Sequence, residues 1–174
     1  LAGVRIDSVD GPGEEALFKS PVGLAVDGGL LYVADLYNGT IRRIDLTTRE
    51  VTTVAGGGTA DHGSGAEVLA SASALAADGN GTLYLGFDGT RTPHFYGVMK
   101  VDLQSAVMAP FVGGDSLGTW APGWGQAAVF ARPAGLALEG GALYVLSGNA
   151  VRKVDVPMGR TTSIAGLEDG AGAH

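Results

Sequence analysis

Three histidines are the side chains in this sequence best suited to bind a metal ion or to transfer a proton. They lie in unrelated contexts: His62 in Asp-His-Gly, His94 in Pro-His-Phe, and His174 at the last position. A catalytic zinc site needs several protein ligands that converge from separate elements. These scattered positions do not supply such a set, so we expect exposed loop histidines, no metal site and no catalytic histidine.

The other candidates for chemistry are serines and acidic, glycine-rich segments. Asp10–Glu15, Asp61–Gly65 and Glu168–Gly172 could offer oxygen ligands to calcium, but none has the dense carboxylate spacing of a dedicated calcium loop. The chain has no cysteine. No Gly-x-Ser-x-Gly elbow is expected at a strand-to-helix turn, because no helix is predicted. We therefore expect no catalytic residue and no cofactor, and we interpret the acidic segments as turns.

Two segments concentrate side chains that commonly line binding surfaces. Gly86–Gly97 carries three neighbouring candidates, and Gly113–Gln126 carries both tryptophans of the chain. Aromatic residues dominate recognition surfaces, and loops on a rigid scaffold are where binding groups usually lie. The candidate binding residues are His94, Phe95, Tyr96, Trp120 and Trp124. For Trp124, the alternative is that its side chain only fixes its own loop to the neighbouring strands.

Composition limits the partners of this protein. The 174 residues include 11 Lys and Arg against 18 Asp and Glu, which gives a formal net charge of −7. Nucleic-acid binding rests mainly on clustered cations, so no nucleic-acid partner is expected. No apolar run reaches the roughly 18 residues of a membrane span, so no membrane partner is expected. The absence of cysteine leaves the compartment open.

An internal repeat predicts the elements that position these loops. A shift of 112 positions aligns Gly11–Asp35 with Gly123–Ser147, and thirteen of the 25 residue pairs are identical. At a shift of 110, Ile41–Gly56 aligns with Val151–Gly166, and a more divergent copy lies between the two. The chain therefore contains three units.

Each unit is predicted to contain four short antiparallel strands. In the first unit they are Gly23–Asp27, Leu30–Asp35, Thr40–Leu46 and Glu50–Gly56. Turns rich in glycine and asparagine separate them, as in β-hairpins. The alternation of apolar and polar residues breaks at Arg42-Arg43, which indicates a β-bulge or a local twist, and Asp35 is expected to pair with Arg42. Units of this length with four strands are typical of propeller blades.

The residues of the first unit also carry a family pattern. They are Phe18, Pro21, Gly23, Leu24, Val26, Asp27, Tyr32, Val33, Asp35, Asn38, Ile41 and Arg42, closed by Val54-Ala55-Gly56. This pattern resembles the NHL repeat, a β-propeller repeat. The middle unit departs from it at Ala72, Phe87 and Met99, so contacts made by those positions in the family are not carried over.

The resemblance implies an all-β fold: a partial NHL-type β-propeller with three four-stranded antiparallel blades. We expect them at about 11–56, 61–113 and 123–166, with partial repeat ends at 1–10 and 167–174. The equivalent leucines Leu24, Leu75 and Leu136 are expected to be buried. Propellers close with four to eight blades, so we expect completion to six blades, by a second copy in a homodimer or by a longer chain.

The function implied by the resemblance is a binding or scaffolding module that contacts a protein or peptide through one face. Strand order predicts that the two enlarged segments, and with them the five candidate residues, share that face. The alternatives are a metal-dependent lyase or hydrolase with six blades, and a module that binds carbohydrate or cell wall. The glycine- and alanine-rich sequence resembles exported bacterial members of the family, and the localisation stays open.

Overall fold

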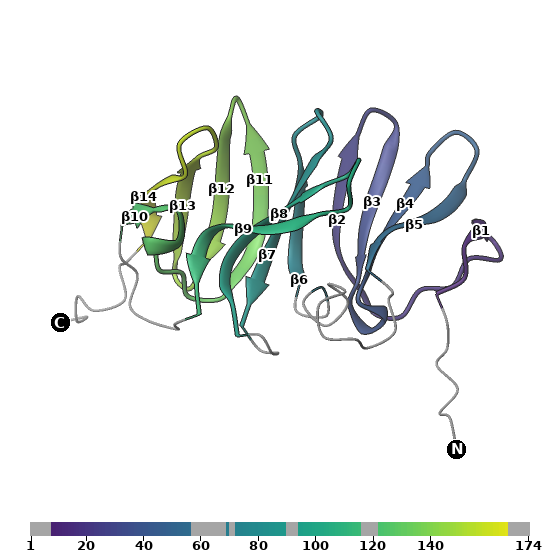
Figure 1. The fold of residues 1–174 in the computed structure, drawn as a ribbon, viewed down its shortest axis with the longest axis horizontal. Helices are drawn as coiled ribbons and strands as arrows, with labels where there is room; N and C mark the ends of the chain where they lie inside the picture. The colour runs from purple at the N-terminus through teal and green to yellow at the C-terminus, as the bar shows by residue number, and fades with distance from the viewer. Residues whose placement is uncertain (1–7, 57–68, 70–71, 90–93, 116–121, 167–174) are drawn as a thin grey trace, which may run out of the picture.

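The computed structural model of this protein describes residues 8–56, 69, 72–89, 94–115 and 122–166. Within these residues the chain forms three antiparallel β-sheets that stand side by side (Figure 1). In each sheet the four long strands lie side by side in the order in which they follow along the chain, as in propeller blades. The three sheets do not close into a ring.

Each sheet corresponds to one unit of the sequence repeat, and we number the blades in chain order. Blade 1 has the strand order β1-β5-β4-β3-β2 and contains β1 (Gly11–Pro12), β2 (Pro21–Asp27), β3 (Leu30–Asp35), β4 (Thr40–Asp45) and β5 (Glu50–Gly56). Blade 2 runs in sequence order and contains β6 (Ala72–Ala77), β7 (Thr82–Asp88), β8 (Tyr96–Asp102) and β9 (Met108–Gly114). Blade 3 has the order β10-β14-β13-β12-β11 and contains β10 (Gly123–Trp124), β11 (Pro133–Glu139), β12 (Ala142–Ser147), β13 (Ala150–Asp155) and β14 (Arg160–Gly166). Two 3-10 helices complete the described elements, η1 (Leu36–Asn38) and η2 (Gly125–Ala127).

The four long strands of each blade confirm the sequence prediction, but β1 and β10 were not predicted. Each is two residues long and pairs with the outermost long strand of its blade. Pro12 lies opposite Glu50, and Trp124 lies opposite Arg160. These pairs are equivalent in the repeat, so the segment that enters each of these two blades pairs with the same strand at the same position. Two residues are too few for alternation to be recognised in a sequence.

Of the two alternatives for the break at Arg42-Arg43, the β-bulge is present in blade 1, and the other two blades have an equivalent bulge. The pairing register shifts between Ile41 and Arg42 in blade 1, and at the equivalent places in blades 2 and 3. A bulge interrupts the two-residue alternation of side chains. Ile41 and Arg42 are consecutive, yet both are fully buried. The bulge is therefore what brings the Arg42 side chain under the sheet.

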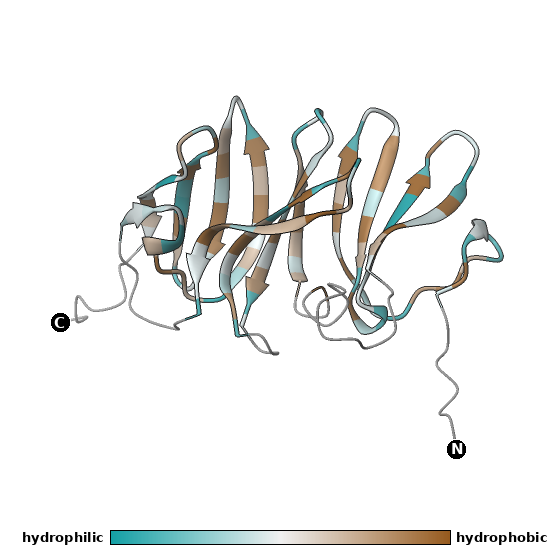
Figure 2. Cartoon of the chain, viewed as in Figure 1, coloured by the Kyte–Doolittle hydropathy of each residue, from teal (hydrophilic) through white to brown (hydrophobic). Residues whose placement is uncertain are grey.

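The hydrophobic core lies between neighbouring blades. One cluster combines side chains of blades 1 and 2, among them Tyr32, Ile41, Leu75 and Leu83. A second combines blades 2 and 3 and includes Tyr84, Val98, Phe130, Leu143 and Val145. Hydrophobic residues are accordingly concentrated in the strands of all three sheets (Figure 2). Each blade thus buries its apolar faces only where another blade adjoins it.

The three equivalent leucines occupy the predicted register but differ in burial. They lie opposite Val33, Leu85 and Val145 in the innermost strand pair of each blade. Leu75 is 4% exposed, and Leu136 is partly buried against the second core cluster. The predicted burial is wrong for Leu24, which is 63% exposed. Its side chain lies on the face of blade 1 that no described part of the chain covers.

Candidate functional site

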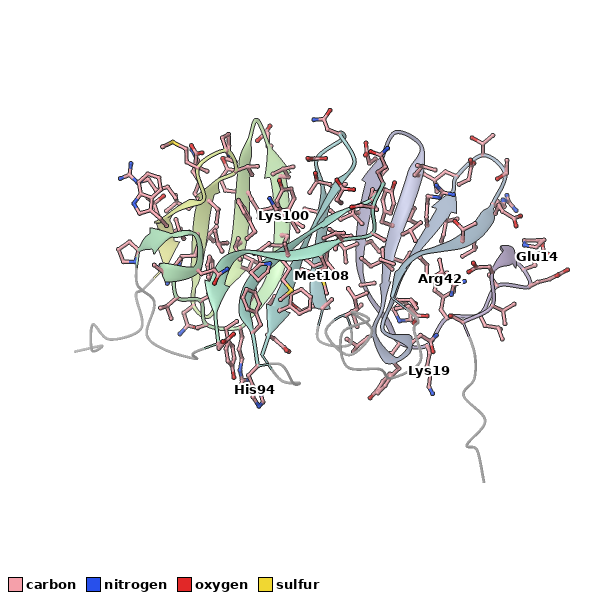
Figure 3. All side chains as sticks on the ribbon, viewed as in Figure 1. Glu14, Lys19, Arg42, His94, Lys100 and Met108 are labelled. Atoms are coloured by element: carbon pink, nitrogen blue, oxygen red, sulfur yellow. The ribbon has the colours of Figure 1, made fainter. Side chains whose placement is uncertain are left out.

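A buried polar centre lies between blade 1 and the segment that enters it. Arg42 is fully buried, and its Nη1 donates to the carbonyl oxygen of Leu17 at 2.7 Å. Its Nη2 donates to the carbonyl oxygen of Val9 at 2.7 Å and to Oδ1 of Asp10 at 2.9 Å. The guanidinium also lies 4.9 Å from the centroid of the Phe18 ring, as in a cation–π contact. Figure 3 shows Arg42 pointing from its strand toward the entering chain.

The predicted pair of Asp35 and Arg42 is confirmed. Their closest atoms, Oδ2 and Nη1, are 3.8 Å apart, and both side chains are fully buried. Asp35 also accepts hydrogen bonds from the backbone N–H of Lys19 and the side-chain amide of Asn38, both at 2.7 Å. Asp35 and Arg42 belong to the strands of blade 1, and both bond backbone groups of the entering segment. The centre therefore joins the strands of blade 1 to that segment. We therefore interpret it as a structural centre.

The same position is built differently in the other two blades. In blade 3, Ser147 replaces Asp35, and its hydroxyl accepts from the N–H and donates to the carbonyl oxygen of Ala131, at 2.9 and 3.1 Å. Arg152 replaces Arg42 and donates to Oγ of Ser163 at 2.8 Å. In blade 2, Phe87 and Met99 stand at these positions, and both are buried. The middle blade therefore replaces the ion pair by apolar packing.

Asp10 has a lowered pKa because of its partners in this centre. Burial alone raises the pKa of the carboxyl, but two hydrogen bonds from Thr53 and the charge of Arg42 outweigh that effect. The backbone N–H and the hydroxyl of Thr53 both donate to Asp10 at 2.9 Å. The result is a pKa below the ordinary value of 3.8.

A pH-dependent stability follows from the lowered pKa of Asp10. A carboxyl whose pKa is lower in the folded than in the unfolded chain stabilises the fold above the unfolded pKa, and this contribution is lost as pH falls through the folded pKa. We expect Asp10→Asn to unfold at a lower temperature than the wild type at about pH 7, with the difference shrinking below about pH 4. Thermal unfolding followed by circular dichroism at several pH values measures both chains.

Subtracting the unfolding temperatures of the two chains at each pH separates the contribution of Asp10 from those of the other acidic groups. Backbone N–H groups of Thr48 and Thr47 lower the pKa of Asp45, and those of Ser105 and Gln104, together with the Ser105 hydroxyl, lower that of Asp102. Both carboxyls are present in both chains and cancel in the difference. A gap between the two chains that stays constant from neutral to acid pH would contradict the prediction.

The enlarged connection between β7 and β8 presents two of its three candidate residues at the surface. His94 is exposed, and its Nδ1 lies 2.9 Å from the carbonyl oxygen of Gly89. Tyr96 is half-buried, and its ring lies against Gly89, where no Cβ would fit. Phe95 is only 5% exposed and packs edge-on against Phe87, with 6.2 Å between ring centroids. Phe95 therefore belongs to the core and does not present its ring to a partner.

Trp124 lies away from this connection. Its strand β10 pairs with the first residue of β14, Arg160, which follows the β13–β14 turn. The β13–β14 turn and the β7–β8 connection lie at opposite ends of the blades (Figure 1). The prediction that Trp124 shares a face with His94 and Tyr96 is therefore wrong. The chain between blades 2 and 3 does not stay at one end, because it runs along the outer edge of blade 3 as β10.

The alternative for Trp124 fits its surroundings. The ring is 53% exposed, and the Arg160 guanidinium lies 5.8 Å from its centroid. This contact joins the entering segment to β14, just as Pro12 joins the entering segment of blade 1 to β5. The other tryptophan of the segment, Trp120, lies outside the described residues.

Tyr37 is a surface aromatic residue that is not among the predicted binding residues. It lies in η1 between β3 and β4, the connection equivalent to that between β7 and β8, and is 59% exposed. Its backbone N–H donates to the carbonyl oxygen of Lys19 at 3.1 Å, and the left-handed Gly39 ends the turn. Figure 3 shows Lys19 and His94 at the same end of the blades. The signal in the sequence was a tyrosine beside the Asn-Gly turn.

The described residues contain no group of three or more His, Asp or Glu side chains placed to hold a metal ion. Two of the histidines considered as ligands, His62 and His174, lie outside these residues. Within the same part of the chain, no helix is long and apolar enough to cross a membrane.

The chain is similar to known proteins in both sequence and fold. The NHL repeat family matches residues 18–44. NHL repeat-containing protein 2 of Gallus gallus is 46% identical over 56 residues, which are 32% of this chain and 8% of that protein. A structural genomics protein of unknown function from Bacteroides thetaiotaomicron superposes with a TM-score of 0.68 at 22% identity, over 88% of this chain and 37% of that one. An auxiliary nutrient binding protein from the same organism superposes with a TM-score of 0.56 at 19% identity, over 83% and 35% of the two chains.

The chain thus spans under a tenth of the length of this relative and about a third of the solved structures. The matched family segment covers Phe18 to Ile44, which includes β2, β3 and most of β4 of blade 1. The same strands recur, in equivalent register, in the other two blades. The chain therefore carries a match to the NHL repeat in blade 1, and its three sheets have the fold of β-propeller blades.

Proposed function

We propose that this chain is a binding or scaffolding module, and that a protein or peptide binds at the end of the blades that carries the β3–β4 and β7–β8 connections. The observation that carries the proposal is the exposure of Tyr37 and His94 in equivalent connections of adjoining blades. Tyr96 lies half-buried beside His94. Aromatic side chains held by rigid strands contribute large contact areas at a low cost in conformational entropy.

The chemistry of this end of the blades fits a polypeptide partner. Tyrosine and histidine combine an apolar ring with a hydrogen-bonding group, which suits the mixed surface of a protein or peptide. Lys19 adds a cation at the same end (Figure 3). The net charge of −7 favours such a partner over nucleic acid.

A peptide selection tests the proposal. A phage-displayed library of random peptides is selected on the immobilised chain, and the selected peptides are synthesised and titrated by fluorescence anisotropy. We expect the double variant Tyr37→Ala with His94→Ala to weaken their binding about tenfold or more, as the loss of an aromatic anchor does. Both side chains are exposed, and circular dichroism of the variant checks that it folds as the wild type does.

The matched control is Trp124→Ala, an exposed aromatic residue at the other end of the blades. It should leave the affinity of the selected peptides unchanged. Failure to select any peptide, or peptides whose affinity survives the double substitution, would overturn the proposal. Peptides that lose affinity with Trp124→Ala instead would move the binding surface to the outer edge of blade 3.

A further inference from the structure

The sequence Asn-Gly-Thr occurs twice in this chain, and the structure places its two copies in different surroundings. One is residues 38–40, at the connection between β3 and β4 of blade 1, and the other is residues 80–82, at the turn between β6 and β7 of blade 2. Asparagine is chemically labile, most of all before glycine, because glycine has no Cβ to hinder an approach to its backbone nitrogen. The two copies therefore allow one chemistry to be compared in two local structures.

The chemistry is the loss of the asparagine side-chain amide, which needs only water besides the chain itself. The backbone nitrogen of the glycine attacks Cγ of the asparagine, and the proton of this nitrogen leaves with the side-chain NH2 as ammonia. A five-membered succinimide ring remains. Water then opens the ring at either of its two carbonyl groups, which gives aspartate or isoaspartate. The first step needs a glycine nitrogen that is free and an asparagine side chain that can turn toward it.

The pair in blade 1 is held away from this reaction. The side-chain amide of Asn38 donates to Oδ2 of the buried Asp35 at 2.7 Å. The N–H of Gly39 donates to the carbonyl oxygen of Leu36 at 3.2 Å. Gly39 is buried, and its carbonyl oxygen lies so close to Gly56 that no Cβ would fit there. Both reacting groups are thus bonded elsewhere, in a closely packed part of the backbone.

The pair in blade 2 lacks these restraints. Asn80 and Gly81 are both exposed, and no described residue accepts a hydrogen bond from the Gly81 N–H. The side-chain amide of Asn80 makes a long contact, 3.4 Å, with the carbonyl oxygen of Asp78. Apart from its chain neighbours, a Cβ built on Gly81 would meet nothing within 4 Å. The space around the reacting atoms is therefore open.

Asp78 keeps the turn in place without engaging the reacting atoms. Its Oδ1 accepts from the backbone N–H groups of Asn80 and Thr82, at 2.8 and 2.9 Å. Its own N–H donates to the carbonyl oxygen of Thr82 at 3.1 Å. These bonds hold both sides of the turn, so the reaction at Asn80 does not require the blade to unfold.

We propose that Asn80 is a site of spontaneous deamidation in the folded protein, and that the buried polar centre of blade 1 protects Asn38. The conversion places aspartate or isoaspartate in the exposed β6–β7 turn and adds one negative charge to the formal −7 of the chain. This turn lies at the end of the blades opposite to the β7–β8 connection (Figure 1). The inference is therefore independent of the proposed peptide binding.

Peptide mapping by mass spectrometry measures both sites in one sample. The folded chain is incubated in mildly alkaline buffer and digested with trypsin, which separates the sites because Arg42, Arg43 and Arg49 lie between them. We expect Asn80 to be converted at least about tenfold faster than Asn38, since two hydrogen bonds must break before Asn38 reacts. A sample digested without incubation gives the background.

Unfolding in urea is the matched control, because the two sites share the same tripeptide. There the rate at Asn38 should rise to that at Asn80. In the folded chain, Asn80→Gln should abolish the fast conversion and leave the rate at Asn38 unchanged, since glutamine would have to close a six-membered ring. Equal rates at the two sites of the folded chain, or faster conversion at Asn38, would overturn the proposal. So would an Asn80 that reacts in urea but stays intact in the folded chain.

Discussion

Replacing Arg42 with alanine is expected to lower the free energy of unfolding by about 3–5 kcal/mol, since breaking a buried ion pair leaves an uncompensated charge. Asp35 would keep its buried carboxylate without the guanidinium 3.8 Å away. The carbonyl oxygens of Leu17 and Val9 would each lose a donor at 2.7 Å. Urea unfolding followed by circular dichroism measures the change. A loss below about 1 kcal/mol would contradict the assigned role of Arg42.

Blade 2 supplies the matched control for this experiment. It carries Phe87 and Met99 where blade 1 carries Asp35 and Arg42, and both are buried. The double variant Asp35→Phe with Arg42→Met should therefore be more stable than Arg42→Met alone, because replacing both members of a buried pair by apolar groups avoids the unpaired charge. Asp35 also accepts from Lys19 and Asn38, so we expect partial recovery. A double variant less stable than both single variants would show that the two residues do not act as a unit.

Truncating the three equivalent leucines to alanine is expected to destabilise the chain to different extents. Leu75→Ala should cost about 2–5 kcal/mol, because it leaves a cavity between blades 1 and 2. Leu136→Ala should cost less, since its side chain is only partly buried. Leu24→Ala should change the stability of the single chain by less than about 1 kcal/mol, because its side chain is 63% exposed.

Urea unfolding of the three leucine variants is best measured at a concentration where light scattering shows a single chain. Leu24→Ala is then the internal control, since it removes the same atoms from the equivalent strand position. Equal losses in all three variants would contradict the assignment of Leu75 to the interface between blades. A large loss in Leu24→Ala alone would contradict the exposure of the first blade face.

The sequence by itself determined the local structure of this protein. Identical residues at shifts of 112 and 110 established the repeat, and the glycine-containing turns delimited four strands in each unit. The interrupted alternation at Arg42-Arg43 indicated a bulge or a local twist, and the spacing of Asp35 and Arg42 predicted their pair. These features depend on residues close in the chain or on opposite arms of one hairpin, where the geometry of the strand leaves few alternatives.

The tertiary structure decided which side chains are covered and which are presented. Leu24 and Leu75 occupy the same register, yet only Leu75 has a blade against it. Phe95 is buried and packs against Phe87, which stands where blade 1 has Asp35. Trp124 lies at the opposite end of the blades, because the two residues of β10 pair with β14. Burial depends on the area that a neighbouring element removes from water, and such neighbours are distant in sequence and carry no local periodic signal.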